Sequence, residues 1–172
     1  MALDLRLLND GFFALDKSFL VYMKYMGQPY DAALKPLLIK ARKENILIDT
    51  GMGELPEKYN QFYPIKRGAD ENLLAQLKKH GLRPEDIDVV VNTHLHFDHC
   101  GNNGLFKHAR FFVQADELRY AYSPERFQMA AYIRELFDVS GLDYEPVRGR
   151  LEVAKGVTVV PTTGHSIGHQ SV

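Results

Sequence analysis

Short apolar runs recur along the chain, each bounded by polar or glycine-containing segments, and they predict β-strands. The predicted strands cover residues 3–8, 19–25, 37–40, 46–49, 87–93, 109–114, 151–154 and 157–160. The third and fourth runs flank a short polar turn and should pair as a hairpin, as should the last two. Residues 170–172 have the composition of a further strand that is beginning.

Amphipathic segments alternate with these strands and predict helices. The predicted helices cover residues 71–80, 115–122 and 125–137, with a short helical turn at 83–86. In the first of them, leucines share one face, Asp70 is a suitable N-cap and Gly81 follows the C-terminal end. Residues 53–68 have the character of a loop. Strands that alternate with helices indicate an α/β protein.

A cluster of histidines follows the predicted strand at 87–93, whose many β-branched residues indicate a buried strand. Three of the seven histidines fall within residues 94–99, as His94, His96 and His99, together with Asp98. On an extended segment, His94 and His96 project from the same face and can bind one ion together. Imidazole and carboxylate are ligands of zinc, iron, manganese and cobalt. The spacing therefore predicts a metal site at the end of a strand, where open α/β sheets place their sites.

A second histidine-containing segment follows the predicted strand at 157–160. His165 and His169 are each preceded by a glycine, which allows the backbone to turn tightly. Either histidine would complete the set of three nitrogens that a catalytic zinc site commonly uses.

These motifs resemble those of a known family. Residues 93–99 resemble the HxHxDH signature of the metallo-β-lactamase superfamily, residues 46–52 resemble its early strand with an Asp-Thr-Gly turn, and residues 163–172 are similar to its TPGHTPGHQS segment. The combination most resembles the N-acyl-homoserine lactonases, which are quorum-quenching enzymes. The resemblance implies a metallo-β-lactamase-like four-layer αββα sandwich, of which this chain covers the N-terminal half and a little more. We expect residues 1–172 to form a single domain that is truncated at its C-terminus.

By position, the resemblance assigns His94, His96 and His169 to a first metal ion, and Asp98 and His99 to a second. It implies two divalent ions in the complete protein, zinc first, with iron, manganese or cobalt as alternatives. We expect the 172-residue chain alone to hold at most one ion tightly and to have weak activity or none.

The remaining polar residues have implied supporting roles. Asp98 is also the expected catalytic residue, which orients the nucleophile or passes on its proton. His165 would fix its loop by hydrogen bonding, and Asp49 would be a buried acid beside the site.

The implied activity is hydrolysis of a lactone ring, of the acyl-homoserine lactone type, by metal-bound hydroxide. Other hydrolases of the same fold, such as a glyoxalase II-like thioesterase, are one alternative. An inactive fragment that binds one metal ion is another. An RNA-processing nuclease or an iron redox protein would use similar ligands, but the near-neutral charge argues against a nuclease.

Composition narrows the range of partners. The chain is 45% apolar and 25% charged, and its net charge is −1. No basic block suggests nucleic acid, and no apolar run is long enough to span a membrane. The single cysteine, Cys100, cannot form an internal disulfide, which suits the cytoplasm. We expect a small-molecule lactone or ester substrate, and we leave open whether the protein is a homodimer.

Overall fold

The computed structural model describes residues 3–21 and 23–172. The strands are β1 (Asp4–Leu7), β2 (Phe12–Asp16), β3 (Pro29–Ala33), β4 (Leu37–Lys40), β5 (Asn45–Ile48), β6 (Ile65–Lys66), β7 (Val89–Val91), β8 (Arg110–Gln114), β9 (Asp143–Val147), β10 (Leu151–Ala154), β11 (Val157–Pro161) and β12 (Gln170–Ser171). The α-helices are α1 (Glu57–Asn60), α2 (Leu73–Lys79), α3 (Phe97–Cys100), α4 (Ala115–Tyr122) and α5 (Arg134–Phe137). Short 3-10 helices are η1 (Lys17–Phe19), η2 (Pro84–Asp86), η3 (Asn103–Leu105) and η4 (Met129–Ala131).

A six-stranded sheet in the order β1-β4-β5-β7-β8-β9 forms the centre of the fold. Strands β5, β7, β8 and β9 are parallel, whereas β1 and β4 are antiparallel to their neighbours. Ile48 of β5 pairs with Val91 of β7, so these two parallel strands end side by side. The segments that carry Asp49 and His94 therefore leave the sheet side by side, at the carboxyl ends of β5 and β7.

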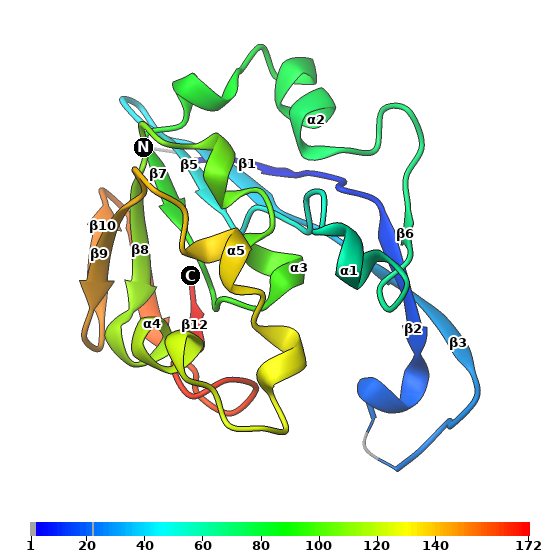
Figure 1. Cartoon of the computed structure of the whole chain (residues 1–172). Coiled ribbons are helices and arrows are strands. Elements are labelled where there is room, and N and C mark those ends of the chain that lie inside the picture. Colours follow the sequence, from blue (N-terminus) through cyan, green and yellow to red (C-terminus); the bar gives the residue numbers. More distant parts are fainter. Residues whose placement is uncertain (1–2, 22) are drawn as a thin grey trace.

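Successive side chains of the central strands point to opposite faces of the sheet, and because both sets are apolar, both faces are covered. Ile46 of β5 packs in one buried cluster with Val159 of β11, so the sheet β10-β11-β12 covers this face. Leu47, the next residue, packs in another cluster with Leu77 of α2 on the opposite face. The result is a helix layer, a sheet layer and a second sheet layer, with α2 well separated from β10 (Figure 1).

A third sheet, in the order β3-β2-β6, extends away from the central sheet as a long β2–β3 hairpin (Figure 1). The predicted strand at residues 19–25 is wrong, because the chain reverses direction there. Asp16 holds the reversal by accepting from the backbone N–H groups of Ser18 at 2.9 Å and Gly27 at 2.6 Å. Met23 and Tyr25 have positive φ angles of 58°, which no strand contains. Tyr22, within the predicted strand, lies outside the described residues.

Other predicted elements need smaller corrections. The helix at 71–80 begins later, and Asn72 rather than Asp70 caps it, with its side chain accepting from the N–H of Ala75 at 2.9 Å. The helix at 125–137 is interrupted, because Tyr132 and Ile133 are extended between η4 and α5 and turn into the core. The expected loop at 53–68 contains α1 and β6, and strand β9 was not predicted.

The two predicted hairpins, the helix at 115–122 and the strand that begins at Gln170 are confirmed. Within the described residues, every helix is too short or too polar to cross a bilayer.

Candidate metal centre

The predicted metal-binding segment leaves the central sheet at the carboxyl end of β7. After Val91 the chain runs through Thr93 and enters α3 at Phe97. The segment between β11 and β12 lies beside it, because the N–H of Gln170 donates to the carbonyl of Thr93 at 2.9 Å. The buried side chain of Gln170 also donates to the carbonyl of Asn92 at 2.9 Å. These bonds bring together the two histidine-containing segments.

Three imidazoles converge where these segments meet. The ligand nitrogens of His94, His96 and His165 all lie within 4.8 Å of one another. His94 is 1% exposed and His96 is 8% exposed, whereas His165 is exposed to solvent. Within the part of the chain that the structure describes, Nε2 of His96 is buried without a hydrogen-bond partner. A buried polar atom without a partner is costly, and a metal ion would satisfy it. The donor set therefore fits a divalent cation.

The electrostatic environment keeps these rings neutral. Burial lowers the pKa of His94, and the surrounding imidazoles lower it further. Burial and the nearby His165 lower the pKa of His96 to about 4. Burial also lowers the pKa of His165 itself. The neutral imidazole, with a free nitrogen lone pair, is the form that binds metals.

His169 lies next to this triad. Its ring centroid is 5.3 Å from that of His94, and its Nδ1 lies 2.8 Å from Oγ1 and 3.1 Å from the carbonyl oxygen of Thr162. By contrast, Nε2 of His165 is 3.2 Å from Nε2 of His94. The geometry favours His165 over His169 as the third nitrogen of the triad.

Asp98 and His99 lie together on α3, next to His94. Asp98 Oδ2 is 3.4 Å from His99 Nε2, and the rings of His94 and His99 are 4.0 Å apart between centroids. Burial opposes a positive charge on His99, but Asp49 and Asp98 together hold its pKa well above the usual value. Burial likewise opposes ionisation of Asp98, but His99 lowers the pKa of this carboxyl. The two side chains expected at a second ion are thus in direct contact.

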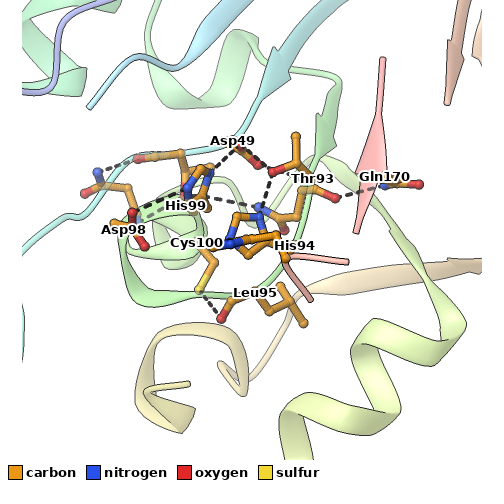
Figure 2. Close-up of polar contacts among 12 residues, drawn as sticks. Asp49, Thr93, His94, Leu95, Asp98, His99, Cys100 and Gln170 are labelled. Carbon is orange, nitrogen blue, oxygen red and sulfur yellow. Dashed lines mark hydrogen bonds and ion pairs between the residues drawn. The ribbon is translucent and has the colours of Figure 1, made fainter. Parts of the chain in front are cut away.

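Asp49 contacts His99 directly and His94 through the hydroxyl of Thr93 (Figure 2). Its Oδ2 lies 2.7 Å from Nδ1 of His99, and because a carboxylate only accepts, Nδ1 donates. Asp49 also accepts from the hydroxyl of Thr93 at 2.8 Å, and this hydroxyl lies 3.0 Å from Nδ1 of His94. Since the hydroxyl donates to Asp49, it accepts from His94 Nδ1–H. Nε2 of His94 is therefore left without a proton and free to bind.

Cys100 follows these residues but does not belong to the donor set. Its side chain is fully buried, and its thiol donates to the carbonyl of Leu95 at 3.5 Å. Burial raises the pKa of this thiol well above its usual value. A thiol that stays protonated is a poor metal ligand.

Glu117 of α4 contacts both histidine-containing segments and was not singled out from the sequence. It is fully buried and bonds to Leu95, Ser166 and Gly168. The sequence feature that could have identified Glu117 is its position four residues before Ala121, on the side of α4 that faces the core. A carboxylate on an apolar helix face indicates a specific set of buried partners.

Comparison of the sequence with known proteins identifies relatives of this chain. Residues 36–172 match the sequence profile of the "Metallo-beta-lactamase superfamily". An N-acyl homoserine lactonase from Bacillus cereus is 32% identical over 144 residues, which are 78% of this chain and 55% of that protein. The N-acyl homoserine lactonase AttM from Azorhizobium caulinodans is 32% identical over 160 residues, which are 84% of this chain and 60% of that protein.

A solved structure has the same fold. It is that of an N-acyl homoserine lactone hydrolase with the product N-hexanoyl-L-homoserine bound at the catalytic metal centre, and it superimposes with a TM-score of 0.85 at 29% identity. The match covers 99% of this chain and 70% of that structure. The present chain thus spans 55% and 60% of the length of the two curated relatives.

Proposed function

Because this chain belongs to the metallo-β-lactamase superfamily, we propose that the protein is a metal-dependent hydrolase that opens lactone rings of the acyl-homoserine lactone type. The predicted fold class is confirmed by the same match and by the solved structure. The observation that carries the proposal is the convergence of three imidazoles, one of which, His96, has a buried Nε2 without a hydrogen-bond partner among the described residues. The names of the relatives support the lactone as substrate.

We propose that His94, His96 and His165 hold a first divalent ion, and that Asp98 and His99 contribute to a second. The close approach of His165 to His94 supports its place in the first set. His169, which the sequence resemblance favoured, is the alternative third ligand. Zinc is the expected metal, because imidazole and carboxylate donors suit it.

A divalent ion held by these nitrogens would supply Lewis acidity, which would make water more acidic and polarise a carbonyl group. The chain itself contributes orientation and proton transfer. Asp49 and Thr93 hold Nε2 of His94 free of protons, as their hydrogen bonds require. Asp98, whose Oδ2 lies beside His99 Nε2, is the group we assign to accept the proton of the attacking water.

The test of the activity is a substrate panel with metal content measured on the same purified sample. The panel contains acyl-homoserine lactones, other lactones, thioesters and phosphodiesters. We expect the complete protein to hydrolyse lactones, with His80→Ala as a control that changes a histidine outside the site. A preference for thioesters would replace the lactone proposal by the thioesterase alternative. A metal-free protein that takes up no added zinc would refute the metal centre.

The test of the third ligand compares His165→Ala with His169→Ala. Loss of a ligand should abolish tight binding of the first ion, whereas loss of a neighbouring group that only orients a ligand should weaken it by about 10–100-fold. We expect the larger effect for His165→Ala, measured as zinc retained against a graded series of chelator. The opposite order of the two variants would assign His169 instead.

A further inference from the structure

Helix α4 carries one buried charged side chain, Glu117, that has no role in the proposed hydrolysis. Glu117 lies in the first turn of α4 and is 0% exposed. Most buried carboxylates face a cation or a metal, because an isolated buried charge is costly. The groups that contact Glu117 are instead neutral hydrogen-bond donors from three other parts of the chain.

Four donors satisfy this carboxylate, two at each oxygen. Oε1 accepts from the backbone N–H of Leu95 at 3.0 Å and from the hydroxyl of Tyr132 at 2.9 Å. Oε2 accepts from the hydroxyl of Ser166 at 2.7 Å and from the backbone N–H of Gly168 at 3.1 Å. A carboxylate has about four lone-pair positions, so its capacity is filled.

The donors come from the two segments that supply the triad. Leu95 lies between His94 and His96, and Ser166 directly follows His165. One oxygen therefore holds the first segment and the other oxygen holds the second. Figure 1 shows α4 next to the chain that leads into β12, in agreement with these bonds.

Close packing adds to the restraint. A Cβ atom placed on Gly168 would lie 2.2 Å from the backbone nitrogen and 2.5 Å from the Cβ of Glu117. The second segment thus rests directly on the first turn of α4, and only glycine allows that approach. Tyr132, a further donor, also packs its ring edge-on against His96, with 4.7 Å between ring centroids.

We propose that Glu117 is a positioning residue for the metal centre: its carboxylate sets the distance between the segment of His94 and His96 and the segment of His165. The inference rests on the proposed function, because it assumes that these imidazoles bind one ion. Two rigid backbone N–H groups, one from each segment, converge on one planar group whose two oxygens are a fixed distance apart.

The Glu117→Gln variant tests this role at nearly constant shape. Its amide carries one acceptor oxygen, so either the N–H of Leu95 or that of Gly168 faces an NH₂ group and loses its partner. We expect the affinity for cobalt(II), added alone to the metal-free protein, to fall about 10–100-fold, as for other residues that orient ligands. The visible absorption of the cobalt complex should change as well, because it reports the arrangement of the ligands.

Two comparisons separate positioning from general stability. Leu77→Ala removes a fully buried side chain on the α2 face of the sheet, so it should lower the free energy of unfolding and leave cobalt affinity and spectrum unchanged. Ser166→Ala and Tyr132→Phe each remove one donor to Glu117 without touching an imidazole nitrogen. Each should weaken cobalt binding in the same direction as Glu117→Gln, and Ser166→Ala should have a smaller effect once Glu117 is changed.

The outcomes distinguish this inference from the proposed function. If the unchanged protein binds no cobalt, the metal centre itself is refuted. If it binds cobalt and Glu117→Gln binds it equally well with the same spectrum, the positioning role is overturned. If Glu117→Gln does not fold, unchanged cobalt affinity in both Ser166→Ala and Tyr132→Phe overturns it equally.

Discussion

Removal of the Asp10 side chain should destabilise the fold through lost acceptors rather than through a lost charge. Asp10 is 1% exposed and joins segments that lie far apart in the sequence. It accepts from the N–H of Met52 after β5 and from the N–H of Leu73 at the start of α2, both at 2.9 Å. Arg67 also contacts it at 2.8 Å. The C-terminal end of α3, the helix that carries Asp98 and His99, packs against the same Met52 segment through Gly101.

The magnitude follows from the groups that each variant leaves without a partner. Asp10→Ala leaves two buried N–H groups unsatisfied, at about 1–3 kcal/mol each, and so should cost about 2–6 kcal/mol. Arg67 keeps the carbonyls of Asp10 and Gly53 as acceptors, and so is not counted. In Asp10→Asn one oxygen can still serve Met52 and Arg67, which leaves only Leu73 unsatisfied and a cost of about 1–3 kcal/mol.

The pH dependence of the free energy of unfolding distinguishes the effect of the charge on Asp10 from the effect of its hydrogen bonds. Burial raises the pKa of Asp10 above the ordinary value of 3.8, although Arg67 and the hydrogen bonds to Met52 and Leu73 lower it. A carboxyl whose pKa is raised on folding adds stability below its unfolded pKa and loses that stability as the pH rises through its folded pKa. The advantage of the natural protein over Asp10→Asn should therefore be larger at acid pH than at neutral pH.

Urea unfolding, followed by circular dichroism at neutral and acid pH, measures these free energies. Asp31→Ala is the control, because Asp31 pairs with Lys66 at 2.6 Å while both side chains are about half exposed. Such a surface pair is worth about 0–1 kcal/mol. The reasoning is refuted if Asp10→Ala costs no more than Asp31→Ala, or if Asp10→Asn and Asp10→Ala are equally unstable.

Two further perturbations test the packing and the metal centre. In Gly101→Ala the added Cβ would lie 1.8 Å from the carbonyl oxygen of Met52, so we expect a loss of about 1–3 kcal/mol in urea unfolding. Gly104→Ala, whose Cβ would meet Val139 at an ordinary 3.6 Å, is the matched control and should be nearly neutral; equal losses would contradict the steric argument. Zinc at a free concentration of about 100 times its dissociation constant should raise the free energy of unfolding by about 2.7 kcal/mol, and should not do so in His94→Ala. An equal gain in that variant would place the bound zinc elsewhere.

Local patterns predicted those parts of the fold that depend on nearby residues. The hairpin of β4 and β5 follows from two apolar runs around a short turn, and α4 follows from its periodicity. The strand predicted at 19–25 failed because composition does not show where a hairpin must reverse, and Asp16 decides that through contacts up to 11 residues away. The long helix at 125–137 failed because Tyr132 and Ile133 gain more by entering the core than by continuing a helix.

The residue types along the chain already specify the chemistry of the candidate site. Five histidines and an aspartate follow two strands, and their side chains have the donor atoms that a divalent ion accepts. Which of these side chains meet depends on how the chain folds. His165 and His94 are 71 residues apart, and their contact depends on the hydrogen bond between Gln170 of β12 and Thr93 after β7 and on the four donors that bond to Glu117. A residue's chemistry is a local property of the chain, whereas the distance between two distant residues depends on all the packing between them.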